Sequence, residues 1–369
     1  MGHKATAEMK KVVCNTKFRL DPFGDGGCKR SAQIRDLMDE NGIAYEDDAF
    51  DLPQGTPKLQ LMRWAFRAMK FVRQHYPGSQ VGSLSNYIRL VKYYALRIPI
   101  VYDKYLHQDV VFLWENTNDR DMLYLLKATG RLIIGMPHNI ESLVANHSTD
   151  ALGQEVFNMK HCDCVFAISK EETWLLRLLG IDACFLPYYP PKEAEAHLLA
   201  IRKRREIRKT NARKRFLLLG SASNYPTRAG MQLLLDYAAN ESLPFDLGIA
   251  GYHTESLSVP QQSGISFYGT VKNEELDSLL EETDAVLIYQ PPTTGALTRI
   301  PEMLIAGVPV FVNFDGGRNF LDTRDVHLYD SFEDLFDALE NFVPYQAEPY
   351  QRDVKAESMF VKTLNNAFE

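Results

Sequence analysis

The stretch at 284–313 reads DAVLIYQPPTTGALTRIPEMLIAGVPVFVN. An apolar run at 285–289 predicts a buried strand, a loop rich in Pro and Thr follows, and a short helix carrying Glu302 leads into a second apolar strand at 308–312. Strand, loop, helix and strand make the βαβ unit of a parallel sheet, and such sheets bind ligands at the carboxyl ends of their strands. The loop at 290–298 is therefore the first place to expect a binding site.

This loop carries groups that suit an anionic ligand. Gly295 lets the backbone approach a ligand closely, Arg299 supplies a cation, and Glu302 adds a carboxylate one helical step later. The start of the helix adds free N–H groups and the positive end of the helix dipole. Three hydroxyls complete the candidate set: Thr293, Thr294 and Thr298.

Pro301 constrains where this helix begins. Proline lacks an N–H group and is tolerated in the first turn of a helix only. We therefore predict that the helix starts late, near Thr298, with Thr298 as its N-cap, and that 291–297 is a loop.

The motif of this stretch resembles the C-terminal signature of GT-B nucleotide-sugar glycosyltransferases, especially the retaining family 4 enzymes related to glycogen synthase. That signature has Gly, three residues, Lys or Arg, two residues, Glu, and then a small-residue turn with Pro before an apolar strand. Many members carry another carboxylate eight positions before the final Glu, where this chain has Thr294. The matching residues are Gly295, Arg299, Glu302, Ala306, Gly307 and Pro309.

The resemblance implies an α/β protein of GT-B fold, with two Rossmann-like doubly wound domains facing a cleft. We expect an acceptor-side domain at 1–191, a linker at 192–214 and a nucleotide-sugar domain at 215–353. The linker prediction comes from the charged tract KEAEAHLLAIRKRREIRKTNARKR. A final helix at 354–369 would return to the first domain.

Composition agrees with two domains. The chain has 369 residues, 45% of them hydrophobic, which is too many for one ordinary core. A net charge of −7 argues against a general nucleic-acid binder. No apolar run is long enough for a transmembrane helix, and the polar lead MGHKATAEMK predicts a disordered tail without a signal segment.

The five cysteines show no paired CxxC framework, so reduced thiols and a cytoplasmic protein are the economical interpretation. We expect no metal site. The one candidate considered, His161 with Cys162 and Cys164, alternates across a strand-like segment and lacks a second ligand pair.

Two segments of the first half are possible ligand sites. After a strand at 11–15, the loop LDPFGDGGCKRSAQI holds Gly26 and Gly27, which permit the tight turns that phosphate or sugar loops need, although an ordinary βα turn explains them too. His138 follows a predicted strand at 132–135, and its PHNIE context resembles the His-Asn-x-Glu segment of family 4 enzymes. There the histidine reaches toward the donor sugar.

The segment at 58–104 is strongly basic and aromatic. Its helical pattern can represent either a basic amphipathic helix on an anionic membrane surface or a solvated face of an ordinary helix. Its only acid is Asp103. The basic residues are Lys58, Arg63, Arg67, Lys70, Arg73, Arg89, Lys92, Arg97 and Lys104.

Two further loops complete the predicted donor site. Ser221 and Arg228 lie between a strand at 215–220 and a helix, where hydroxyls, N–H groups and a guanidinium can hold a diphosphate. The resemblance places Gly269 and Val271 beside the nucleobase. Elsewhere, Ser169 and Glu172 form a capping box that explains both residues without a ligand.

The resemblance implies transfer of a sugar from a nucleotide diphosphate sugar to a hydroxyl of a polysaccharide, glycan or lipid-linked acceptor. It implies a hexosyltransferase-like enzyme that retains configuration, uses no metal and needs no cofactor beyond the nucleotide-sugar co-substrate. Arg228 and Arg299 would balance the diphosphate, Glu302 would bind the ribose and His138 the sugar. A GT-B nucleotide-sugar epimerase and a non-catalytic sugar-nucleotide-binding relative remain alternatives.

Overall fold

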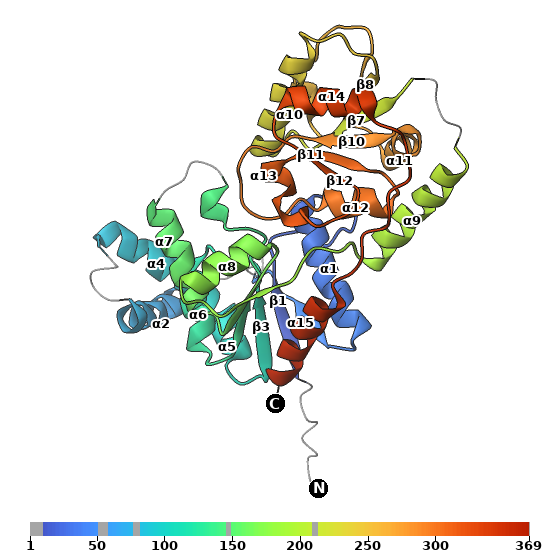
Figure 1. Ribbon diagram of the computed structural model, residues 1–369. Coiled ribbons are helices and arrows are strands. Elements are labelled where there is room, and N and C mark those ends of the chain that lie inside the picture. The colour runs from blue at the N-terminus through green and yellow to red at the C-terminus, as the bar shows by residue number, and fades with distance from the viewer. Residues whose placement is uncertain (1–9, 51–57, 77–81, 145–148, 209–212, 369) are drawn as a thin grey trace.

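A computed structural model describes residues 10–50, 58–76, 82–144, 149–208 and 213–368. The predicted disordered tail at 1–10 lies outside these residues except for Lys10. The chain forms two lobes, each built on a six-stranded parallel sheet flanked by helices (Figure 1). This is the predicted two-domain α/β architecture.

The first sheet has the strand order β2-β1-β3-β4-β5-β6. Its strands are short and nearly all apolar, and β3 is buried along its whole length, as expected for a parallel sheet covered on both faces. The strands are β1 (Lys11–Asn15), β2 (Tyr45–Asp47), β3 (Val110–Trp114), β4 (Ile133–Gly135), β5 (Cys164–Ala167) and β6 (Ala183–Phe185).

The second sheet has the order β12-β11-β10-β7-β8-β9, with β7 and β10 in its centre. The strand predicted at 285–289 is β10, and the one predicted at 308–312 is β11, which pairs with β10 in parallel. The strands are β7 (Arg215–Leu219), β8 (Asp246–Ala250), β9 (Ile265–Gly269), β10 (Ala285–Ile288), β11 (Val310–Asn313) and β12 (Val326–Tyr329).

The helices of the first lobe connect and cover its strands, and a helical segment between β2 and β3 stands away from the second lobe (Figure 1). That segment comprises α2 (Lys58–His75), α4 (Leu84–Arg97), η1 (Ile98–Tyr102) and α5 (Asp103–Tyr105). The others are α1 (Gly26–Glu40), α6 (Arg120–Ala128), η2 (Glu141–Leu143), α7 (Thr149–Lys160) and α8 (Lys170–Leu178).

The second lobe is covered in the same way, and its last helix, α15, leaves it to pack on the first sheet beside α1 (Figure 1). The helices are α9 (Lys192–Glu206), α10 (Tyr225–Ala238), η3 (Thr254–Ser256), α11 (Asn273–Glu282), α12 (Arg299–Ile305), α13 (Phe314–Gly317), η4 (Arg318–Phe320), α14 (Phe332–Asn341) and α15 (Val354–Asn366).

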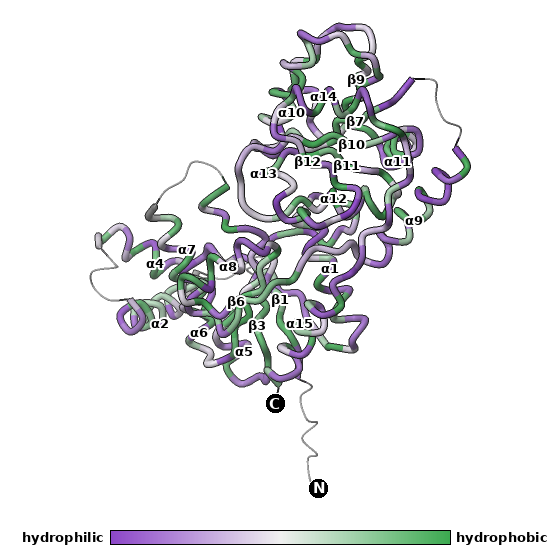
Figure 2. Tube along the Cα trace, viewed as in Figure 1, coloured by the Kyte–Doolittle hydropathy of each residue, from purple (hydrophilic) through white to green (hydrophobic). Residues whose placement is uncertain are grey.

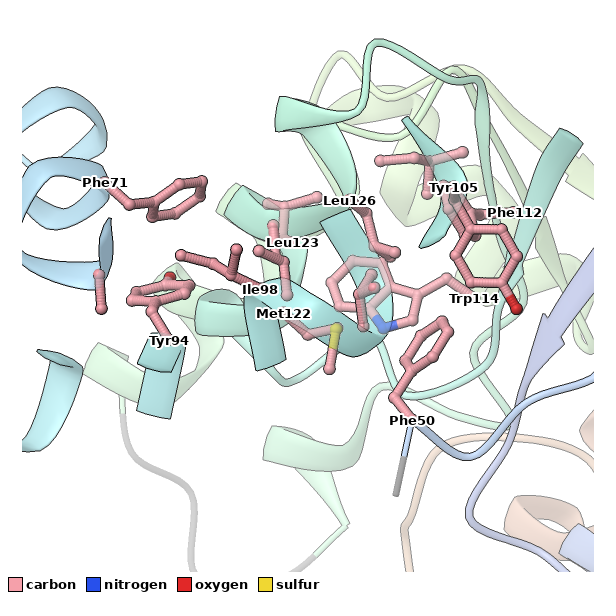
Figure 3. Packing of buried hydrophobic residues seen from close by; sticks show 14 of the residues in the cluster. Phe50, Phe71, Tyr94, Ile98, Tyr105, Phe112, Trp114, Met122, Leu123 and Leu126 are labelled. Atoms are coloured by element: carbon pink, nitrogen blue, oxygen red, sulfur yellow. The ribbon is translucent and has the colours of Figure 1, made fainter. Parts of the chain in front are cut away.

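The apolar residues gather on the strands and the inner helix faces of each lobe (Figure 2). In the first lobe, one cluster joins β3 to the helical segment between β2 and β3, with Trp114, Phe112 and Tyr105 fully buried (Figure 3). Burial of such large side chains stabilises the lobe by about 1.5–3 kcal/mol each. This core holds the carboxyl end of β3 in place.

The tract at 192–214, predicted as a linker, begins with a helix. Residues 192–206 form α9, which buries Leu198 and Ile201 against the second lobe. The buried Arg205 donates hydrogen bonds to the carbonyls of Leu280, Thr283 and Gly307. Because most residues of the tract are charged, its narrow apolar stripe is not evident in the sequence, and the charges alone predict a solvated segment.

The helix after the 290–298 loop begins at Arg299, as Pro301 predicted, and no regular helix runs through 291–298. Thr298 occupies the N-cap position, but its own backbone is helical (φ −61°, ψ −27°) and its side chain makes no capping bond. Within the described parts of the chain, no helix is long and apolar enough to cross a membrane.

Candidate functional site

His138 lies just past the carboxyl end of β4, at the edge of the first sheet that faces the second lobe. Its Nε2 is 3.0 Å from Oε2 of Glu115, and its ring stacks on Phe18 with centroids 4.5 Å apart. The Nδ1 atom is buried and has no hydrogen-bond partner among the described residues. The ring is thus held on two sides while one nitrogen stays available to a ligand.

Glu115, which orients His138, is a buried carboxylate with strong partners. Arg35 donates to its Oε1 at 2.5 Å, and Ser31 donates to its Oε2. Burial alone would raise the pKa of Glu115, but the hydrogen bond with His138 and the charge of Arg35 outweigh it and lower the pKa to about 2. No sequence pattern singles out Glu115, since nothing near it in the chain marks it as a site residue.

A cavity of about 170 Å³ opens beside this pair at the carboxyl ends of β1, β3 and β4. Its lining combines hydroxyl, amide and carboxylate groups with one lysine, which suits a polar ligand with several hydroxyls. The lining residues are Lys17, Phe18, Glu115, Asn116, Thr117, Asn118, Pro137, His138, Asn139, Glu141 and Glu155.

The loop at 290–298 reaches across from the second lobe to His138. Gly295 has φ +81°, and a Cβ there would lie 3.4 Å from the carbonyl oxygen of His138 and 3.2 Å from Cβ of Asn139. Thr294 donates from Oγ1 to the carbonyl of Ile140 at 3.1 Å. Two predicted site residues, His138 and Gly295, are therefore neighbours, although they are far apart in the sequence.

Glu172 fixes this approach from the first lobe. Its Oε1 accepts bonds from the backbone N–H of Ile140 at 2.9 Å and of Gly295 at 3.0 Å. Ser169 caps α8 as predicted, with the Glu172 N–H donating to its Oγ at 3.1 Å. The capping box explains Glu172 only in part, because its carboxylate also joins the two lobes.

Residues of the second lobe complete this contact. Arg318 donates to the carbonyl of Gly295 at 2.6 Å and to Glu171 at 2.5 Å, and Asn319 donates to Glu171 at 2.9 Å. No sequence pattern marks these residues, because an Arg-Asn pair carries no recognisable signal. We call this set the Gly295 contact: Ile140, Glu171, Glu172, Thr294, Gly295, Arg318 and Asn319.

A second contact joins the lobes at Glu302. Its Oε2 accepts a bond from Lys29 Nζ at 2.7 Å, and its Oε1 accepts one from the Tyr188 hydroxyl at 2.8 Å. The Glu302 side chain is only 8% exposed. We call these three residues the Glu302 contact. A ribose that binds Glu302 must share or displace Lys29.

Arg299 points away from this contact, beneath the loop between β7 and α10. Its guanidinium donates to the carbonyl of Leu219 at 2.5 Å and to the Thr227 hydroxyl at 3.3 Å. Desolvation, partly offset by Glu302, lowers the pKa of Arg299 to about 10, so the group stays cationic at neutral pH. Asn224 caps the adjacent start of α10. A cation and a helix start thus meet where the sequence predicted a diphosphate.

The glycine loop of the first lobe also faces the second lobe. Gly26 begins α1, and a Cβ on it would lie 3.6 Å from the Thr298 hydroxyl. Gly27 leaves room for the ring of Phe18, which a Cβ would overlap. These glycines therefore allow close approach of α1 to Thr298 and of Phe18 to the helix.

The remaining predicted donor residues do not join these contacts. Ser221 bonds to Ser223, and the exposed Arg228 lies over the ring of Tyr225. Thr293 is half-buried in the 290–298 loop. Gly269 has φ +71° at the end of β9, and Val271 packs partly into the core of the second lobe.

No family model matches this chain, and no curated protein matches it in sequence. Solved structures do resemble it. Anabaena Alr3699/HepE in complex with UDP aligns with a TM-score of 0.60 at 12% identity, over 97% of this chain and 100% of that one.

Two other solved structures give the same result. A UDP-forming α,α-trehalose-phosphate synthase from Burkholderia xenovorans has a TM-score of 0.56 at 11% identity, over 98% and 96% of the two chains. A TarM variant from S. aureus in complex with fondaparinux, α-GlcNAc-glycerol and UDP has a TM-score of 0.51 at 12% identity, over 75% of this chain and 59% of that one. The fold is GT-B, as predicted.

Proposed function

We propose that this protein transfers a sugar from a nucleotide diphosphate sugar to a hydroxyl acceptor, with retention and without a metal ion. The observation that carries the proposal is the meeting of Gly295 with His138 across the two lobes, with Arg299 beside the start of α10. The likeness to structures that hold UDP supports a uridine nucleotide as the first donor to test.

The roles follow from chemistry and position. The departing diphosphate gains negative charge, which Arg299, Arg228 and the N–H groups at the start of α10 would balance. His138, held by Glu115 and Phe18, would bind the sugar through its free Nδ1. Glu302 would accept the ribose hydroxyls. The polar cavity beside His138 would take the acceptor, a glycan or a lipid-linked sugar of polysaccharide synthesis.

The test begins with a thermal-shift screen of UDP, GDP, ADP and TDP sugars, since a ligand that binds only the folded state stabilises it. Donors that raise the melting temperature are then incubated with a broad acceptor set. We expect transfer, or slow donor hydrolysis without an acceptor. Turnover of UDP-N-acetylglucosamine to another UDP-sugar would instead identify an epimerase. Binding with neither transfer nor hydrolysis would identify a non-catalytic relative.

We also propose that α2 and α4 bring the enzyme to the inner face of an anionic membrane. Each helix exposes an apolar pair spaced four residues apart, Met62 and Phe66 on α2 and Leu84 and Ile88 on α4, with exposed fractions of 59–75%. Between them lies an apolar groove of about 390 Å³. The exposed cations that flank these pairs are Arg63, Lys70, Arg73 and Lys92.

The number of basic residues in this segment is larger than its number of unpaired positive charges. Arg67 pairs with Asp103, Arg89 with Asp121, and Lys104 with Glu46 and Asp48. Each remaining cation near the surface adds about 1 kcal/mol to binding at low salt. Tight lipid binding therefore needs the apolar pairs as well.

Flotation with anionic and neutral liposomes tests this contact. We expect binding to anionic liposomes that falls with salt and is lost in a Phe66→Ser, Ile88→Ser double variant. Leu178→Ser is the matched control, because Leu178 is 67% exposed on α8, outside the segment. No binding to anionic liposomes at low salt, or an equal loss of binding in the control, would mean that α2 and α4 are an ordinary solvated helix pair.

A further inference from the structure

Two cysteines and an aspartate meet at the edge of the first sheet. Cys164 opens β5, Cys184 lies in the edge strand β6, and Asp182 directly precedes β6. Their two Sγ atoms and a carboxylate oxygen all lie within 4.8 Å of one another. The group sits at the amino ends of its strands, whereas His138 follows the carboxyl end of β4. It therefore takes no part in the candidate site.

The strand register explains why these side chains converge. In the parallel β5–β6 pair, Val165 lies opposite Ala183 and Phe166 opposite Cys184. Cys164 is therefore diagonal to Cys184, and alternation along β6 puts Asp182 and Cys184 on one side of the sheet. This is the side covered by α15, because Cys164 and Cys184 both pack in the cluster that contains Phe360.

The charges around the group suit a cation. The Cys164 thiol is buried and lies close to the Asp182 carboxylate, so a thiolate formed here needs a positive partner. Cys164 is buried, Cys184 is half-buried and Asp182 is exposed, so an ion can enter from the solvent at Asp182. Two thiolates and a carboxylate are ligands that Zn²⁺ accepts in tetrahedral sites.

We propose that Cys164, Asp182 and Cys184 bind one Zn²⁺ ion, with a water molecule as the fourth ligand. On binding, each thiol releases its proton to solvent, so two protons leave for each ion bound. The three anionic ligands and the dication leave a net charge of −1. The ion would join β5 to the edge strand β6 beneath α15, remote from the sugar-transfer chemistry. This site is independent of the proposed function.

This site could not be predicted from the sequence. The pattern His161, Cys162 and Cys164 drew attention to neighbours along one segment, but Cys162 lies against Gly135, on the opposite side from Cys164. The partner of Cys164 is Cys184, twenty positions further on, and only the pairing of β5 with β6 reveals it.

Equilibrium titration of the reduced full-length chain with Cd²⁺, followed by thiolate-to-metal charge-transfer absorbance, tests the site. We expect one Cd²⁺ per chain, displaced by Zn²⁺. Cys184→Ser should remove the absorbance, and Asp182→Asn should weaken Cd²⁺ binding at least about tenfold. Cys162→Ser is the matched control, since it removes a neighbouring thiol outside the group, and it should leave the titration unchanged.

A second measurement needs no variant. Zn²⁺ should protect Cys164 and Cys184 of the wild-type chain from alkylation under native conditions while Cys28 stays reactive. The proposal is overturned by the absence of a charge-transfer band, by a band that survives in Cys184→Ser or disappears in Cys162→Ser, or by alkylation of Cys184 that Zn²⁺ does not slow. A Cys164–Cys184 disulfide that forms at saturating Zn²⁺ would overturn it as well.

Discussion

The Gly295 contact and the Glu302 contact join the same two lobes but use different chemistry. At the first, Glu172 accepts from the N–H group of Gly295, and Arg318 donates to the carbonyl of the same residue. At the second, the partners of Glu302 are side chains, a lysine and a tyrosine. A residue held at both its N–H and its carbonyl group fixes the position of a loop. A carboxylate held by side chains can exchange a partner for a ligand.

This difference separates two tasks within one short stretch of chain. The Gly295 contact positions the 290–298 loop against His138. In the proposed function this placement would exist before a donor binds, which is the preorganisation that catalysis requires. The Glu302 contact balances a buried carboxylate with Lys29, a cation that a ribose would share or displace in the same proposal. Arg299 lies between the two in the chain and belongs to neither.

The largest effect should come from Arg299. Arg299→Ala removes the cation beneath the loop between β7 and α10, and we expect kcat for transfer to fall about 100-fold, the usual cost of losing one group that stabilises developing charge. Initial-rate kinetics with a saturating donor measure this. Arg228→Ala is the control for an exposed cation, with a smaller expected loss. Full activity in Arg299→Ala would contradict the role of this residue.

The next prediction tests whether the Glu302 carboxylate can exchange Lys29 for a nucleotide. Glu302→Ala should weaken binding of the nucleoside diphosphate by about 1.5–3 kcal/mol, the range for hydrogen bonds to a charged group. Lys29→Met frees the same carboxylate without removing it and should leave nucleotide affinity equal or higher. Calorimetric titration with UDP measures both. Unchanged affinity in Glu302→Ala, or an equal loss in both variants, would make the Glu302 contact a purely structural one.

Sequence patterns predicted the elements that both contacts use, because strands, caps and prolines are local features. β10, the cap of α8 at Ser169 and the start of α12 lie where the apolar run, the capping box and Pro301 predict them. The same local signals predict that His138 follows a strand and that Gly295 lies in a loop.

The sequence does not predict which residues of the two lobes contact each other. Lys29 and Glu302 are 273 positions apart, and Glu172 and Gly295 are 123 apart. The distances between such pairs depend on how two complete sheets pack, which no local period encodes. For this reason a capping box accounts for Glu172 only in part, and no local pattern marks Arg318 or Asn319.

The third prediction uses the pH dependence of the Gly295 contact. Burial raises the pKa of Glu172, although N–H groups of Ile140 and Gly295 act in the opposite direction. A raised folded-state pKa contributes stability that is present below the ordinary carboxyl pKa and is lost as pH rises through the folded value. Glu172→Gln is neutral at every pH, so the stability of wild type minus that of the variant should fall as pH rises.

Urea unfolding between pH 5 and pH 8 measures this difference. Glu46→Gln is the control, because Lys104 and Lys11 lower the pKa of Glu46 to about 2 and its contribution is lost only as pH falls toward that value. The wild-type minus Glu46→Gln difference should therefore stay constant over the same range. A difference for Glu172→Gln that rises with pH would show that the carboxylate gains more from its N–H partners than it loses by burial.

The smallest effect concerns Thr294, where many family 4 enzymes have a carboxylate. Its hydroxyl donates to the carbonyl of Ile140, so it supports the Gly295 contact through one neutral hydrogen bond. Such a bond contributes about 0.5–1.5 kcal/mol, less than a contact made by a charged group. Thr294→Ala should therefore lower transfer less than tenfold and change discrimination between donor sugars only slightly, because Glu172 and Arg318 still hold Gly295.

Competition kinetics with two UDP-sugars measure this, with Thr293→Ala as the neighbouring control. A loss as large as that of Arg299→Ala would mean that Thr294 binds the donor directly, and the Gly295 contact would then be part of the sugar site and not its support.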